Sequence, residues 1–209
     1  MLESFYASAW QHPGMSWLVC ALAVPFVLRV KDVTLRNVLL LFTATTALDA
    51  WLTGAWSPLP QGSLLARNVS IAFVIWGDAR LFVLLQKFRR DDATWKRAWA
   101  TGLGLAFIVP VIQAIAIRAF PEAFVEERRI YLVYEAAFEV LGCVLLLSGY
   151  ARSWVATSLL GFFVVQYALW VASDVLILAG QTWAYGLRLI PNAMYYGLFL
   201  GFAARRAGT

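Results

Sequence analysis

Residues 98–119 read AWATGLGLAFIVPVIQAIAIRA, and no charged side chain occurs in this stretch before Arg118. A helix rises about 1.5 Å per residue, so about 20 apolar residues cross the hydrocarbon core of a bilayer. Similar apolar stretches, separated by short polar turns, lie on both sides of it. The sequence therefore predicts an all-α polytopic membrane protein with seven transmembrane helices, at residues 15–30, 37–56, 68–88, 98–119, 130–150, 154–179 and 183–204.

The composition agrees with a membrane protein. The chain has 209 residues, of which 62% are hydrophobic and 14% charged, and its mean hydropathy is +0.71. A soluble domain carries roughly 25% charged residues, and a chain of this size cannot bury such an apolar excess in one soluble core. None of the polar connections is long enough for a second domain, so residues 1–209 are predicted to form a single transmembrane domain.

The positions of lysine and arginine predict the orientation in the membrane. With the N-terminus outside and the C-terminus in the cytoplasm, eleven of the 17 basic residues lie in cytoplasmic segments. Four lie outside, and Arg80 and Arg188 lie within spans. Short cytoplasmic loops are enriched in basic residues, so this asymmetry favours seven spans over six. We expect the membrane to be a bacterial inner (plasma) membrane. The cytoplasmic set is Arg29, Lys31, Arg36, Lys87, Arg89, Arg90, Lys96, Arg97, Arg152, Arg205 and Arg206.

The same distribution argues against some partners and cofactors. The net charge is +5, but the basic residues lie in loops between apolar runs, so we expect the lipid bilayer as partner and no nucleic acid. The only histidine is His12, and Cys20 and Cys143 show no metal-binding or redox spacing. We therefore expect no metal and no cofactor. Nothing in the sequence indicates the oligomeric state.

The spans also show an internal rhythm. The first three and the last three each run helix, basic turn, helix, glycine-containing turn, helix and basic pair, and the pairs are Arg89-Arg90 and Arg205-Arg206. Two triplets joined by one span form a parallel 3+1+3 repeat. This layout resembles that of SWEET-type sugar transporters, PnuC-type vitamin transporters and microbial rhodopsins. Retinal needs a lysine within the seventh span, and Lys31, Lys87 and Lys96 all lie at helix ends, so a covalent retinal pigment is not expected.

Seven ionisable residues fall within the predicted spans, where each costs roughly 2.5–3.5 kcal/mol on insertion scales. An intramembrane charge is therefore a candidate functional group. Helical spacing places Glu135 and Glu139 on one face, where two acids cannot easily both ionise; one keeps a proton or a cation lies between them. Together with polar neighbours on the same stripes, the candidate ligand- or proton-binding residues are Asp49, Asp78, Arg80, Glu135, Glu139, Gln166, Trp170, Asp174, Arg188, Asn192 and Tyr195.

Three classes of function remain open. If the polar stripes converge, they line an outward-facing acidic and aromatic cavity, as in a transporter or binding protein for a small cationic or polar solute, with protons as a coupling ion. An intramembrane enzyme would use two acids, such as Asp78 and Asp174, as general acid and base on a lipid. A non-catalytic sensor or complex subunit would have a packed interior in which every charge is paired. The sequence favours the transporter or binding protein.

Overall fold

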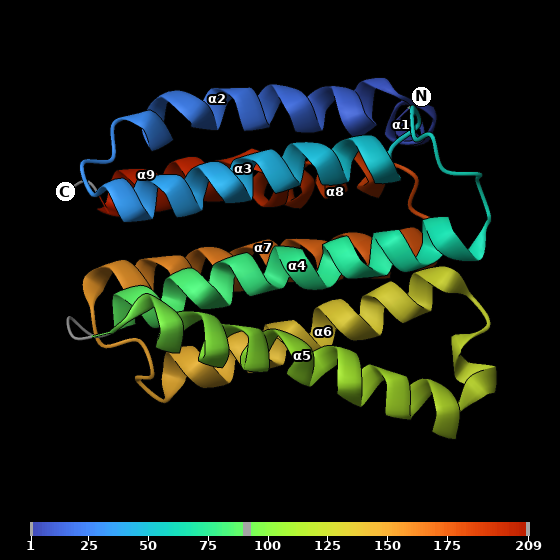
Figure 1. Ribbon diagram of the computed structural model, residues 1–209. Coiled ribbons are helices and arrows are strands. Elements are labelled where there is room, and N and C mark those ends of the chain that lie inside the picture. Colours follow the sequence, from blue (N-terminus) through green and yellow to red (C-terminus); the bar gives the residue numbers. More distant parts are fainter. Residues whose placement is uncertain (1, 90–92, 208–209) are drawn as a thin grey trace. The chain divides into compact units, whose positions relative to one another are not determined.

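The computed structural model describes residues 2–89 and 93–207, and these residues form helices and turns without any strand. Figure 1 shows their order along the chain. The all-helical prediction is therefore confirmed for this part of the chain. Arg90 and the turn residues 91 and 92 lie outside the described residues. The elements are α1 (Leu2–Tyr6), the π-helix η1 (Trp10–Met15), α2 (Ser16–Leu28), α3 (Val33–Thr53), α4 (Leu64–Arg89), α5 (Trp95–Ala119), the 3-10 helix η2 (Pro121–Phe124), α6 (Glu127–Leu147), α7 (Trp154–Leu178), α8 (Ala184–Ala193), the π-helix η3 (Met194–Leu198) and α9 (Phe199–Ala207).

Within the described residues, five helices are long and apolar enough to cross a membrane. They are Trp10–Leu28, Leu64–Arg89, Trp95–Ala119, Arg128–Leu147 and Trp154–Leu178. Several helices of this length and hydropathy indicate an integral membrane protein. The predicted ranges 37–56 and 183–204 are also helical, but α3 and the stretch from α8 to α9 are not among these five. The count of seven spans therefore stays a prediction.

Local sequence signals explain where several helices begin and end. Asp32, Thr94 and Ser153 precede α3, α5 and α7, and each side chain accepts a hydrogen bond from a backbone N–H of the first turn. Such caps satisfy donors that have no partner inside the helix. Gly149 and Gly180 follow α6 and α7 with φ of 65° and 81°. This left-handed conformation, which glycine adopts without strain, closes the last turn of each helix.

The chain divides into two compact units. Unit 1 comprises Met1–Gly77 and Tyr185–Thr209, and unit 2 comprises Asp78–Ala184, so the division falls within α4. This grouping places the last helical stretch with the first helices and does not follow the predicted triplets. The parallel repeat therefore stays a prediction.

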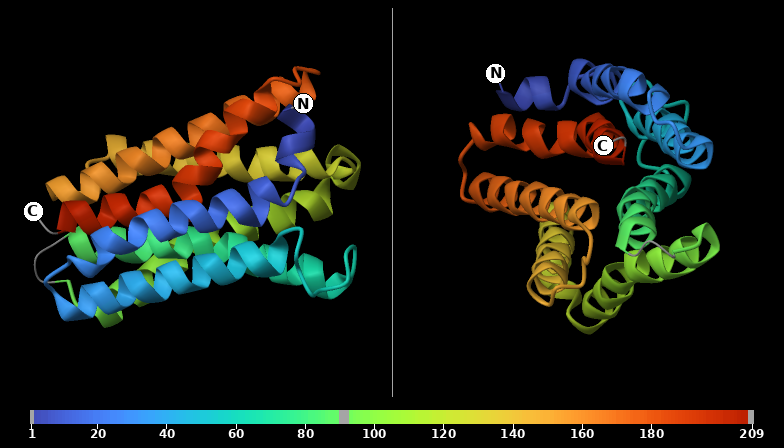
Figure 2. Two further views of the ribbon diagram at one scale, coloured as in Figure 1. Left: turned by 90° about the horizontal axis from the view of Figure 1, so that it is seen from above. Right: turned by 90° about the vertical axis from the view of Figure 1, so that its left-hand side faces the viewer.

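In unit 1, α2 lies alongside α3 and alongside the stretch of η3 and α9 (Figure 2). The approach of η3 is close, because a Cβ on Gly197 would lie 2.2 Å from the carbonyl oxygen of Val19. Cys20 lies at the same contact, and its Sγ donates a hydrogen bond to the carbonyl oxygen of Tyr196 at 2.9 Å. η3 begins three residues after Pro191, which lies inside α8. A proline removes one helical hydrogen bond, and a π-turn is one local rearrangement that accommodates the loss.

In unit 2, α6 and α7 form the main helix pair, and α5 contacts the second half of α4. A Cβ on Gly102 would lie 2.7 Å from Cα of Val83, so only glycine permits this approach of α5 to α4. The core of the unit is aromatic. Phe82, Phe138 and Phe163 are buried, with ring centroids 5.5 to 6.0 Å apart, which is the usual spacing of interacting rings.

Candidate functional site

A buried carboxylate lies next to this aromatic core in unit 2. Asp78 of α4 is 2% exposed, and each of its two oxygens accepts one hydrogen bond. Tyr134 Oη of α6 donates to Oδ2 at 2.5 Å, and Tyr167 Oη of α7 donates to Oδ1 at 2.5 Å. These distances are typical of hydrogen bonds to an ionised oxygen. We call Asp78, Tyr134 and Tyr167 the Asp78 site.

Aromatic rings enclose the Asp78 site. The Tyr167 ring lies 4.5 Å from Phe163, 5.4 Å from Phe138 and 5.2 Å from Trp170, measured between centroids. The Tyr134 ring lies 4.9 Å from Phe138. The phenol groups are therefore held in place by packing, while the surroundings provide little solvation for a negative charge. Of the residues predicted on the α7 stripe, Trp170 belongs to this enclosure.

Arg80 lies two residues beyond Asp78 on α4 and is also buried. Its guanidinium acts on Asp78 electrostatically, but it makes no ion pair with that carboxylate within 4.0 Å. This agrees with the helical geometry, which directs residues i and i+2 to different faces. The direct partners of Asp78 among the described residues are thus two neutral phenols.

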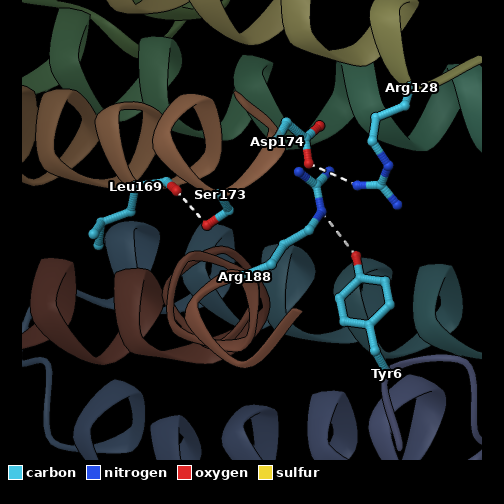
Figure 3. A network of polar contacts seen from close by, with 6 residues as sticks. All are labelled: Tyr6, Arg128, Leu169, Ser173, Asp174 and Arg188. Carbon is cyan, nitrogen blue, oxygen red and sulfur yellow. Dashed lines mark hydrogen bonds and ion pairs between the residues drawn. The ribbon is translucent and has the colours of Figure 1, made fainter. Parts of the chain in front are cut away.

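A second buried carboxylate of unit 2 has a cationic partner. Asp174 near the end of α7 is 0% exposed, and its Oδ1 lies 2.7 Å from Nη1 of Arg128 at the start of α6. Figure 3 shows the Arg128 side chain directed at Asp174, with Ser173 turned back to the carbonyl oxygen of Leu169. Arg128 therefore provides charge compensation for Asp174.

The two glutamates of α6 differ in their surroundings. Glu135 is buried, whereas Glu139 is half-buried and accepts a 3.5 Å contact at Oε1 from the thiol of Cys143. The thiol is a weak donor, so this contact provides little stabilisation of a charge. Gln166 of α7 is buried as well. Among the described residues, no three His, Cys, Asp or Glu side chains are grouped so that they could hold a metal ion.

The remaining predicted site residues belong to unit 1. Asp49 of α3 is buried, and its Oδ1 accepts a hydrogen bond of 3.1 Å from Thr53. Tyr195 of η3 donates to the carbonyl oxygen of Phe73 at 2.9 Å. Asn192 lies on α8, half-buried.

Arg188 of α8, also in unit 1, has a tyrosine partner. Its Nε donates to Oη of Tyr6 at 2.9 Å (Figure 3), and the Tyr6 ring lies 5.4 Å from that of Tyr185. Arg188 thus connects α8 to α1 within unit 1. The predicted residues therefore divide between the two units.

Several partners were not singled out in the sequence. Tyr134 and Tyr167 are neighbours of the predicted Glu135 and Gln166 along the chain, and Arg128 is one of the four basic residues predicted to lie outside. His12 was used only to exclude histidine-rich sites, yet its Nε2 lies 2.9 Å from Oγ1 of Thr53. A search for ionisable residues overlooks neutral hydroxyl donors, although a buried tyrosine hydroxyl in a span needs a partner as well.

Comparison with known proteins gives no relative from which a role could be transferred. No protein-family model matches this chain, and neither a curated protein nor a solved structure shows significant similarity to it.

Proposed function

We propose that this chain is a membrane transporter or binding protein for a small polar or cationic solute, coupled to a proton that binds at Asp78. The observation that carries the proposal is the Asp78 site, in which a fully enclosed carboxylate accepts hydrogen bonds of 2.5 Å from Tyr134 and Tyr167. An ionisable group in a membrane helix is costly and marks proton or ion pathways.

Neutral partners allow the charge of Asp78 to change. A carboxylate paired with a cation loses an ion pair when it is protonated, whereas Asp78 would lose only part of its hydrogen bonding. The buried position penalises the charged form, and the two phenols stabilise it. These opposing effects make proton binding and release at Asp78 a chemically reasonable role.

Proton binding would also change contacts between helices of unit 2. In the ionised form both phenols donate, one from α6 and one from α7. A protonated carboxyl group must donate through one oxygen, so one of the phenols must accept or turn away. Protonation would thus weaken the connection of α4 to α6 or to α7, which provides a coupling between proton occupancy and helix packing.

We further propose seven crossings, with the N-terminus outside and the C-terminus cytoplasmic. α3 has 21 residues, which is enough for the roughly 30 Å core of a bilayer, and α8, η3 and α9 follow one another without a break. Within unit 1, α1 and the end of α9 lie at opposite ends of α2 (Figure 1), as an odd number of crossings requires. The bias of lysine and arginine supports the orientation.

The other classes of function are less well supported. A general acid and base pair needs two carboxylates that reach one water. Asp78 and Asp174 each have their own partners, namely two phenols and Arg128. A packed subunit or sensor would pair its buried charges with counter-charges, and Asp78 departs from that pattern.

Infrared difference spectroscopy tests the proton site without knowledge of the solute. The protein in lipid nanodiscs is compared between acidic and neutral pH. We expect a protonated-carboxyl band of Asp78 that disappears in Asp78→Asn and persists in Asp174→Asn, whereas bands of other acids remain in both variants. Tyr134→Phe and Tyr167→Phe should shift the frequency of the same band, because each removes a hydrogen bond to that group. An unchanged band in Asp78→Asn would refute the proposal.

A second experiment tests the coupling to transport. Proteoliposomes that contain a pH-sensitive dye receive ethanolamine or guanidinium from outside, and the internal pH is recorded. We expect a pH change with the wild-type protein and with Asp174→Asn, and none with Asp78→Asn. A wild-type protein that gives no response to either cation would contradict coupling to this class of solute, even if the infrared band is present.

A further inference from the structure

A chain of three polar side chains crosses from η1 to α3 in unit 1. Nε2 of His12 lies 2.9 Å from Oγ1 of Thr53, and this hydroxyl lies 3.1 Å from Oδ1 of Asp49. Thr53 also lies 2.8 Å from the carbonyl oxygen of Asp49, one helical turn before it. Both polar steps are within hydrogen-bond distance, so the three side chains form a continuous connection.

The backbone around His12 fixes this geometry. His12 has φ −139° and ψ 107°, an extended conformation that interrupts the helical backbone of η1. Its carbonyl oxygen accepts a hydrogen bond of 3.1 Å from the N–H of Ala55, just beyond the end of α3. A Cβ on Gly54 would lie 2.9 Å from Cδ of Pro13, so glycine permits the close approach. The imidazole is thus held at the last turn of α3.

Burial increases along the connection. His12 and Thr53 are half-buried, whereas Asp49 is buried. On the other side of the imidazole, Nδ1 lies 3.0 Å from Oγ of Ser16, and the ring centroid lies 5.1 Å from that of Tyr196 with the planes tilted by 45°. A half-buried titratable group is therefore connected, through one hydroxyl, to a carboxylate inside the unit.

We propose that His12, Thr53 and Asp49 form a proton relay that carries protons between the partly exposed end of η1 and the buried carboxylate of Asp49. This role goes beyond the proposed function, because it concerns a different acid in a different unit. It gives unit 1 a response to pH on the side where its N-terminus lies.

The relay conserves protons and charges at every step. With a proton on Nε2, His12 donates to Thr53, and Thr53 donates to the Asp49 carboxylate. A proton that arrives at Nδ1 forms the imidazolium. The Nε2 proton then passes to Oγ1 of Thr53 while the hydroxyl proton passes to Oδ1 of Asp49. His12 is left neutral with its proton on Nδ1, Thr53 is unchanged, and Asp49 is a neutral acid.

Other titratable groups lie on the elements that pack near the imidazole. The elements packed against η1 include α1, α2 and α3, and Tyr196 reaches the ring from η3. The titratable or charged residues of this surrounding are Glu3, Tyr6, Cys20, Asp49, Arg188 and Tyr196. Arg188 is engaged with Tyr6, and Cys20 donates to a backbone carbonyl oxygen. Asp49 is the acid to which the hydroxyl of Thr53 connects the imidazole.

Time-resolved infrared spectroscopy after a pH jump tests the relay. The carboxyl band of Asp49 is assigned by its absence in Asp49→Asn and is recorded in an Asp78→Asn background, which removes the other proposed proton site. We expect His12→Gln and Thr53→Val to slow the protonation of Asp49 about tenfold or more, because they interrupt the relay. Thr53→Ser, which keeps the hydroxyl, should restore the rate.

The matched control is Thr43→Val, because the hydroxyl of Thr43 on the same helix bonds only to the backbone of its own α3. It should leave the rate unchanged. An Asp49 band that rises equally fast in the wild type, His12→Gln and Thr53→Val would overturn the relay, and so would the absence of any Asp49 band.

An equilibrium titration tests the same connection without the His12 and Thr53 variants, in case these do not fold. Since His12 is the only histidine, selective ¹⁵N-histidine labelling reports a single imidazole. Two coupled groups titrate together in macroscopic steps, so the wild-type curve should contain two steps and the Asp49→Asn curve one. Identical curves would overturn the proposal.

Discussion

Two buried carboxylates of unit 2, Asp78 and Asp174, have opposite kinds of partners. Asp78 is 2% exposed and accepts hydrogen bonds from two neutral phenols. Asp174 is 0% exposed and lies 2.7 Å from the guanidinium of Arg128. Both acids pay a similar cost of removal from water, but only Asp174 has a cation at ion-pair distance.

The two acids therefore differ in whether a permanent cation lies beside them. Arginine does not lose its proton in proteins, so the partner of Asp174 stays charged. Phenol partners stabilise the ionised carboxylate by donating hydrogen bonds. After reorientation, a phenol can also accept a hydrogen bond from the protonated acid. The comparison therefore supports our proposal that Asp78 exchanges a proton, and we expect a structural role for Asp174.

Removal of Arg128 should produce the largest loss of stability. Arg128→Ala takes the cationic partner from a fully buried carboxylate, and we expect the free energy of unfolding to fall by about 3 kcal/mol. The matched control is Arg129→Ala, whose ion pair with Glu126 is exposed and should contribute less than about 1 kcal/mol. Equilibrium unfolding in mixed detergent and SDS micelles measures both variants, and equal losses would contradict the structural role of Asp174.

Removal of one phenol should have a smaller effect. Tyr134→Phe and Tyr167→Phe each delete one hydrogen bond to Asp78, which lowers the free energy of unfolding by about 2 kcal/mol at neutral pH. The same unfolding assay at acidic pH should give a smaller loss, since a protonated Asp78 needs only one of the phenols as a donor. Thr101→Val, which removes a hydroxyl bonded only to its own helix, serves as control. A loss that is independent of pH would contradict proton exchange at Asp78.

The contact between Cys143 and Glu139 should contribute least. A thiol at 3.5 Å from a half-buried carboxylate is a weak donor, and Cys143→Ala should change the free energy of unfolding by less than about 0.5 kcal/mol. Cys20→Ala, which removes a buried thiol bonded to the backbone at 2.9 Å, should cost about 1 kcal/mol in the same assay. The reverse order would show that Glu139 depends on its neighbour more than the geometry indicates.

Much of the fold follows from local signals. The lengths of the apolar runs predict membrane helices, and the turn and cap residues predict their ends, as Ser153 and Gly180 show for α7. The close approaches at Gly102 and Gly197 could not be predicted, because a glycine in an apolar run gives no indication of which helix it contacts. The division into units within α4 has no marker in the sequence either.

The candidate site shows the same limit. The buried acids could be found one by one, since a charge in a membrane helix is conspicuous by its cost. Their partners could not, because Tyr134 and Tyr167 are 56 and 89 residues away from Asp78 along the chain. Tyrosines are common at membrane interfaces, so neither residue attracts attention without its contact.

The sequence by itself determined that this chain is helical and that several helices suit a bilayer, because run length and hydrophobicity are properties of single segments. The tertiary structure decided which acid accepts hydrogen bonds from phenols, which acid pairs with an arginine and which acid contacts a hydroxyl bound to histidine. These contacts join separate segments that only packing brings together. The charge state of each acid depends on that choice, since in a medium without water the nearest donor determines the energy of the anion.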